Sequence, residues 1–327
     1  MDILSADSLP WLHAAQQRLR GAYEAARLPH SLLLLSAPGL GAEQLATWGT
    51  ALALCDSPGP RPCDACASCR LLRSDTHPDT HIVRLEEDAQ QIKIDQVREL
   101  IDSLTLKSYR GGYKVGVIEG AEALNANGAN AFLKTLEEPA ANTLLIMIAT
   151  PNHRLPATIA SRCLRLSLRP PATQVAVEWL RSKSPAVKQW GAALALAGGA
   201  PLLALQLDAA GLTALDADMQ QSVVELADAS VDVTLLAERW LRSNPGVRIT
   251  WLENWITQRV HALLGMPTSQ QTAEPVRLPA ALLKPKIRAL FELLDAARDT
   301  RRLASTGMSQ QLALEALLIS GRTALAK

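Results

Sequence analysis

Short apolar runs alternate with longer amphipathic segments through the first half of the chain. Runs rich in Leu, Ile and Val, bounded by polar or turn-forming residues, predict five strands at 32–36, 81–85, 115–119, 144–150 and 164–168. Between the second and third strands, Val97, Leu100 and Leu104 recur at helical spacing after Asp95, which predicts an amphipathic helix capped by Asp95. Strands alternating with helices are typical of a parallel sheet with crossover helices, so we expect this helix to pack against the sheet.

The pattern changes at Pro170 and Pro171, where two consecutive prolines interrupt regular structure. Beyond them the strand-like runs give way to Ala- and Leu-rich helical periodicity, which Gly198, Gly199 and Pro201 interrupt once more. The predicted fold class is therefore α/β plus all-α. We expect three domains, at 1–168, 169–211 and 212–327.

Composition and charge fit a soluble globular protein. The chain has 327 residues, of which 48% are hydrophobic and 20% are charged, and its formal net charge is +1. No run of about 18 apolar residues is present, and the N-terminal stretch lacks a positive segment followed by an apolar one. We expect a cytoplasmic protein with no membrane anchor and without a strongly basic arm for nucleic acid.

The stretch LLLLSAPGLGAEQLA, at 32–46, has the outline of a phosphate-binding loop without the residues that bind phosphate. A Walker A loop, G-x-x-x-x-G-K-[ST], needs its Lys for the phosphate oxygens and its hydroxyl for Mg²⁺. Here the frame is Ser36, four residues, Gly41, Ala42 and Glu43. The loop has lost a positive charge and gained a negative one, and both changes oppose ATP binding.

A second stretch, VGVIEGAEALN at 115–125, has one acidic residue where Mg²⁺ and the attacking water need two. Glu119 occupies the first acidic position and Gly120 the second. We therefore expect no ATP in this chain's own site and no intrinsic ATPase activity. On these two stretches alone, a fold that never bound nucleotide is an equally good explanation.

Four cysteines lie together in CDSPGPRPCDACASC, with the spacing C-x7-C-x2-C-x2-C: Cys55, Cys63, Cys66 and Cys69. Four thiolates at this spacing can surround one ion as a closed tetrahedron, which predicts a structural Zn²⁺ site. Disulfides are a poor alternative in a cytoplasmic chain with an odd total of five cysteines. An iron–sulfur cluster would usually require a further cysteine and proline, C-x3-C-P, which do not follow here.

The stretches NANGANAFLKTLEEPAANTLLIMIAT, at 125–150, and LPATIASRC, at 155–163, resemble the clamp-loader branch of the AAA+ proteins. THPD, at 76–79, and the four-cysteine insertion add to this resemblance, which is dense over 30–170 and weak after about 210. The resemblance implies a RecA-like AAA+ domain, a small helical lid and a C-terminal helical collar that joins subunits into an open ring.

The same resemblance implies a role for Arg162, in the motif Ser161-Arg162-Cys163. In the family's ATPase subunits a neighbour supplies this arginine to the γ-phosphate, so Arg162 is expected to act as an arginine finger in trans. Thr150 resembles the sensor 1 position, and Leu202 stands where active ATPases have a sensor arginine. Without the resemblance, a salt bridge between Arg162 and a nearby carboxylate is the first interpretation.

The resemblance also implies the partners. We expect a hetero-oligomer with ATPase subunits of the gamma/tau type and a delta subunit. The complex would act on the sliding clamp and on primed DNA, with no membrane involved. The alternatives are an active ATPase of the same fold and a free-standing zinc-dependent DNA-binding module, which the near-neutral charge disfavours.

Overall fold

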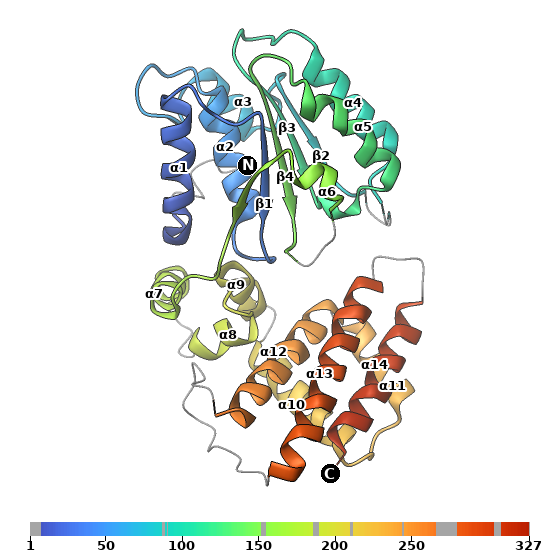
Figure 1. The fold of residues 1–327 in the computed structure, drawn as a ribbon. Coiled ribbons are helices and arrows are strands. Elements are labelled where there is room, and N and C mark those ends of the chain that lie inside the picture. The colour runs from blue at the N-terminus through green and yellow to red at the C-terminus, as the bar shows by residue number, and fades with distance from the viewer. Residues whose placement is uncertain are drawn as a thin grey trace. The chain divides into compact units, whose positions relative to one another are not determined.

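The computed structural model describes residues 8–86, 89, 91–151, 155–185, 190–209, 212–243, 245–265, 280–303 and 309–326. The chain divides into two compact units, Met1–Val175 and Ala176–Lys327, shown in Figure 1. The first unit contains a sheet and the second is helical in its described part. The fold class expected from the sequence is confirmed, while the separation of 169–211 from 212–327 stays a prediction.

Five parallel strands form the sheet of the first unit, in the order β2-β3-β4-β1-β5. The strands are β1 (Ser31–Leu35), β2 (Thr80–Val83), β3 (Lys114–Glu119), β4 (Thr143–Ala149) and β5 (Leu164–Ser167). All five predicted strands are confirmed, with every boundary within two residues of the prediction. The central strand β4 is buried along its whole length, as its unbroken apolar sequence indicates.

Helices lie on both faces of this sheet. They are the 3₁₀ helices η2 (Pro10–Leu12) and η3 (Ala121–Ala123), and α1 (His13–Glu24), α2 (Ala42–Leu54), α3 (Ala67–Arg73), α4 (Ile94–Thr105), α5 (Ala126–Glu137) and α6 (Ala157–Ala160). In Figure 1, α1 and α2 lie on one side of the sheet and α4 and α5 on the other.

The predicted packing of α4 on the sheet is confirmed, since Val97, Leu100 and Leu104 are buried. The contact is close at Gly116 of β3, where an added Cβ would lie only 2.8 Å from Leu100 Cδ1.

The predicted cap of α4 is wrong. The helix begins at Ile94, so that Lys93 is the N-cap residue and Asp95 lies inside the first turn. The Lys93 N–H donates to Gln96 Oε1 at 3.0 Å. The Gln96 side chain therefore caps the first turn, and the helix begins one residue before Asp95. Asp95 still stabilises the helix, because a carboxylate in the first turn interacts favourably with the helix dipole.

The second unit consists of helices in its described part, the first of which begins just before the boundary. They are α7 (Thr173–Lys183), α8 (Trp190–Leu196), α9 (Pro201–Ala209), α10 (Leu212–Ala227), α11 (Val233–Arg242), α12 (Pro245–Leu263), α13 (Ala280–Leu303) and α14 (Gln310–Leu325). Within the described ranges, no helix combines the length and the apolar character needed to cross a lipid bilayer.

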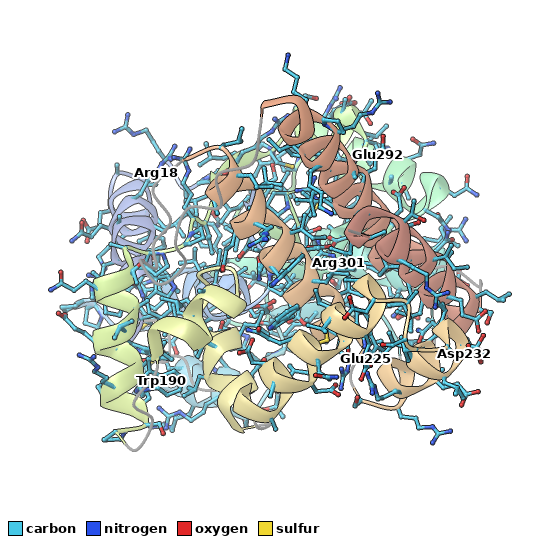
Figure 2. All side chains as sticks on the ribbon, turned by 90° about the horizontal axis from the view of Figure 1, so that it is seen from below. Arg18, Trp190, Glu225, Asp232, Glu292 and Arg301 are labelled. Carbon is cyan, nitrogen blue, oxygen red and sulfur yellow. The ribbon has the colours of Figure 1, made fainter. Side chains whose placement is uncertain are left out.

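Aromatic and aliphatic side chains from α10 to α14 form the core of this unit. Trp240 and Trp251 are buried, and Trp255 stacks on Trp251 with ring centroids 6.4 Å apart, so these tryptophans pack the helices together. Ion pairs also join the helices: Arg301 of α13 lies 3.1 Å from Glu253 of α12, and Glu225 of α10 lies 3.0 Å from Arg239 of α11. Figure 2 labels Arg301 and Glu225 among the side chains.

Candidate functional site

The altered phosphate-binding loop connects β1 to α2, at the carboxyl end of the strand. Gly41 has φ +93° and is the N-cap residue of α2, a conformation that favours glycine. An added Cβ at Gly41 would lie 3.0 Å from Leu9 Cδ1 and 3.2 Å from Leu12 Cδ1. The N-terminal segment therefore packs directly on the loop, and Trp11 Nε1 donates to the carbonyl oxygen of Leu40 at 2.8 Å.

Neither position that should contact the triphosphate offers suitable chemistry. Ala42, in the lysine position, is 2% exposed and provides only a methyl group. Glu43 lies in the first turn of α2, where its carboxylate interacts with the positive end of the helix dipole. That positive end is the feature that would otherwise attract phosphate.

The acidic residue at the end of β3 is already paired. Glu119 accepts two hydrogen bonds from Arg84, at 2.8 Å from Nε and at 3.1 Å from the terminal nitrogen. Gly120 has φ +72°, so a glutamate in this position would be strained. Nearby, Thr150 donates its hydroxyl to Glu122 Oε1 at 3.2 Å. The predicted sensor 1 residue thus contacts a carboxylate.

Arg162 lies between α6 and β5, at the amino end of β5. Its backbone carbonyl accepts a hydrogen bond from Ser31 Oγ at 2.7 Å, which places it beside the first residue of β1. The loop begins at Ser36, five residues further along β1. At about 3.3 Å per residue, Arg162 and its own loop are separated by roughly 16 Å, at opposite ends of the sheet.

The Arg162 guanidinium has partners in its own chain. It donates to Glu137 Oε1 at 2.5 Å and to the carbonyl oxygen of Thr158 at 2.9 Å. The side chain nevertheless remains 36% exposed. The salt bridge expected in the absence of any resemblance is therefore present, and the guanidinium is still accessible to a ligand.

The four predicted zinc ligands lie together. Cys55 follows α2, Cys66 is the N-cap residue of α3 and Cys69 lies within α3, while Cys63 comes from the connecting loop. All four Sγ atoms lie within 4.8 Å of one another, and the Cys55 and Cys66 sulfurs are 3.8 Å apart. A tetrahedron with Zn–S bonds of about 2.3 Å has S···S edges of about 3.8 Å, so the donor set and its spacing fit this ion.

The thiols of this cluster differ in their electrostatics. Backbone N–H groups of Ala65 and Cys66 lower the pKa of Cys63 to about 6. Burial raises the pKa of Cys69 and also that of Cys55. Burying several thiolates together is costly unless a cation neutralises them, which a divalent metal does.

A polar network, partly buried, joins the cysteine cluster to the loop after α4. Asp56 accepts from the Ser68 N–H at 3.2 Å and from Arg110 at 2.9 Å. His77 Nε2 lies 3.2 Å from Ser68 Oγ, and its Nδ1 accepts from the Asp79 N–H at 3.1 Å. Because Nδ1 accepts, Nε2 bears the proton in the neutral ring, and burial lowers the pKa of His77. His77 is thus a core histidine, 5% exposed.

Asp79 is the residue of this network that sequence reasoning missed, although it lies in the THPD stretch. It is 4% exposed and accepts from the Tyr109 N–H at 2.7 Å, the Arg110 N–H at 3.1 Å and Ser108 Oγ at 3.0 Å. No periodicity identifies such a residue, because its three donors lie some 30 residues further along the chain.

Replacing Asp79 by Ala should therefore destabilise the first unit by about 2–3 kcal/mol, since three donors lose a buried, charged acceptor. The free energy of unfolding in urea would measure the loss. Asp102→Ala is the matched control, because Asp102 is exposed on α4, and it should change stability by less than about 0.5 kcal/mol. Equal stability of the two variants would contradict this assignment.

Comparisons with known proteins show which proteins this chain is similar to. Residues 11–172 match the family model described as DNA polymerase III, delta subunit. A DNA polymerase III subunit delta' from Pseudomonas aeruginosa is 32% identical over 322 residues, covering 96% of this chain and 97% of that protein. Its Escherichia coli counterpart is 38% identical over 201 residues, covering 61% and 60%. Among solved structures, a DNA polymerase III gamma subunit-related protein from Thermotoga maritima covers 94% of this chain and 98% of its own, at 17% identity and a TM-score of 0.43.

Proposed function

The chain belongs to the family of DNA polymerase III delta-prime subunits, and we propose that it is a non-catalytic clamp-loader subunit. In this role it supplies Arg162 to the ATP site of a neighbouring ATPase subunit. The assembled ring then places the sliding clamp on primed DNA during replication.

The observation that supports this proposal is the position of Arg162 at the end of the sheet opposite to its own loop. A side chain at that end cannot reach a triphosphate bound in its own subunit. It can reach one bound by a neighbour whose loop faces this edge. A planar, permanently charged guanidinium there neutralises the charge that develops on the transferred phosphoryl group.

The chain's own pocket supports the non-catalytic half of the proposal. Ala42 and Glu43 replace the residues that hold phosphate and Mg²⁺, and Gly120 replaces the second acidic residue. Glu119 is neutralised by Arg84. Each change weakens either MgATP binding or activation of water, so we infer that this subunit does not hydrolyse ATP.

We further propose that residues 169–211 are a lid and that 212–327 form the collar through which the subunit joins the ring. Large apolar side chains are exposed in this region, including Leu235, Phe291, Leu312 and Ile319. Leu312 and Ile319 lie seven residues apart on α14, and therefore on one face of the helix. Such a face suits packing against the collar helices of gamma/tau-type and delta subunits.

The four cysteines are proposed to hold one structural Zn²⁺ ion, with no open position for catalysis. For such a replication role we expect the protein to act in the cytoplasm. It contacts the sliding clamp and primed DNA through the complex.

Nucleotide titration of the isolated protein tests the non-catalytic assignment. We expect no Mg²⁺-dependent ATP binding at micromolar concentrations, measured by calorimetry or by a shift in Tm with ligand concentration. The gamma-type ATPase subunit serves as the positive control. Saturable hydrolysis by the isolated chain would instead establish an active ATPase.

A further inference from the structure

Glu137 is the last residue of α5 and lies in the sequence TLEEP, at 135–139. Its carboxylate contacts the Arg162 guanidinium although the two residues are 25 positions apart. Both side chains are partly exposed, at 51% for Glu137 and 36% for Arg162. An ion pair this open to solvent contributes little to folding stability, so its presence calls for another explanation.

The contacts fix one side of the guanidinium. Glu137 Oε1 accepts from one terminal nitrogen, and the other donates to the Thr158 carbonyl at 2.9 Å and to Ser161 Oγ at 3.5 Å. A guanidinium has five N–H groups, and these three hydrogen bonds leave two of them, including the Nε–H, without a hydrogen-bond acceptor among the described residues. The free N–H groups can meet phosphate oxygens while Glu137 and Thr158 keep their hydrogen bonds.

The position of Glu137 at the end of α5 restricts where its carboxylate can lie. Glu137 ends a helix whose inner face, including Phe132 and Leu136, is buried in the core of the sheet domain. The carbonyl ends at the C-terminus of α5 also carry partial negative charge, which favours a cation at this point. A long, flexible arginine is thereby held in one orientation before any neighbour arrives.

We propose that Glu137 is a positioning residue for Arg162, which orients the guanidinium toward the neighbouring subunit's triphosphate. This inference rests on the proposed function, because it assumes that Arg162 acts in trans. Orienting the arginine in advance reduces the conformational entropy lost when it engages the transition state. The benefit should therefore appear in kcat of the neighbouring ATPase more than in its KM for ATP.

The test uses the reconstituted ring in which the neighbouring subunit is the single hydrolysis-competent ATPase. Glu137→Ala should lower kcat at that site roughly 3–10-fold, with KM for ATP changed less than about twofold. Glu137→Gln should fall between wild type and Glu137→Ala, because its amide oxygen still accepts a hydrogen bond. Glu138→Ala is the matched control: Glu138 is exposed, adjacent and outside the contacts of Arg162, and its loss should leave kcat unchanged.

A double variant separates positioning from a general structural effect. In the Arg162→Ala background, Glu137→Ala should have no further effect, because the residue it positions is gone. Additive losses, or wild-type turnover in Glu137→Ala while Arg162→Ala is impaired, would overturn the inference alone. Wild-type turnover in Arg162→Ala itself would overturn the proposed function together with it.

Discussion

Replacing Arg162 by Ala is expected to slow ATP hydrolysis at the neighbouring site by roughly 10³-fold or more while leaving ring assembly intact. The expected size follows from the role of the guanidinium. In the proposed role it would neutralise charge that develops mainly in the transition state, so its removal should raise the barrier more than it weakens ATP binding. Assembly should survive because Arg162 is partly exposed, and its contacts with Glu137 and Thr158 contribute little to stability.

Single-turnover hydrolysis in a reconstituted ring gives the cleanest measurement. The other ATPase subunits should have inactivated phosphate-binding loops, so that turnover reports the site next to this chain alone. Arg162→Lys tests geometry, because lysine keeps the charge but loses the planar arrangement of donors, and we expect it to restore only part of the rate.

Arg165→Ala is the matched control for the loss of a positive charge. Arg165 lies three residues further on, in β5, and is exposed, with its Nε donating to the Ala160 carbonyl at 3.0 Å. Its removal should leave the rate within about twofold of wild type. If Arg162→Ala hydrolysed ATP as fast as Arg165→Ala in an intact ring, the arginine would have no role in trans.

Much of the sheet could be predicted from the sequence because buried parallel strands are continuous apolar runs. β4 is the clearest case, with seven consecutive buried residues. The start of α4 was less predictable, since Gln96 and Asp95 both offer side chains near the first turn and only the fold decides which of them satisfies the Lys93 N–H. The sequence around the first turn does not by itself distinguish Asp95 from Gln96 as the capping residue.

The candidate site was predictable where its residues are close in sequence. The cysteine cluster follows from its spacing, and the structure brings all four sulfurs together. The contacts of Arg162 with Glu137 and of Asp79 with Tyr109 link residues 25 and 30 positions apart. Such contacts depend on how helices and loops cross the sheet, and no periodicity in either segment indicates them.

The structure adds a physical argument for the proposed role of Arg162 that the resemblance did not supply. In a parallel sheet, a residue that precedes a strand and a loop that follows a strand lie at opposite ends. Arg162 precedes β5, and the altered loop follows β1, which pairs directly with β5. This topology by itself prevents action in cis, whatever the nucleotide state of the chain's own pocket.

Removing one of the four proposed zinc ligands should have the largest effect on the structure of the first unit. Purified under reducing conditions, the wild-type protein is expected to contain one zinc per chain by elemental analysis. Cys69→Ser should lose the metal, because its thiol is the most deeply buried of the four, and serine is a poor replacement for thiolate as a zinc ligand. Chelation of the wild-type protein should have the same effect. Structural zinc contributes up to about 10–16 kcal/mol of binding free energy in isolated zinc-finger peptides, so its loss should unfold the insertion.

Hydrogen exchange locates that unfolding. Amides of residues 55–75 should lose protection, while those of β4 should keep it, because the strand is covered by helices on both faces. Cys163→Ser is the matched control: this fifth cysteine lies outside the cluster, and a serine there could still donate to the Ile159 carbonyl that the thiol contacts at 3.2 Å. It should retain the metal and the protection of 55–75. Reduced wild-type protein that contained no metal, or iron in place of zinc, would rule out the zinc site.

Loss of protection should extend to Arg110, because Asp56, which follows Cys55, is its ion-pair partner. Asp79 holds the same loop independently, so exchange there should rise less than in the insertion itself.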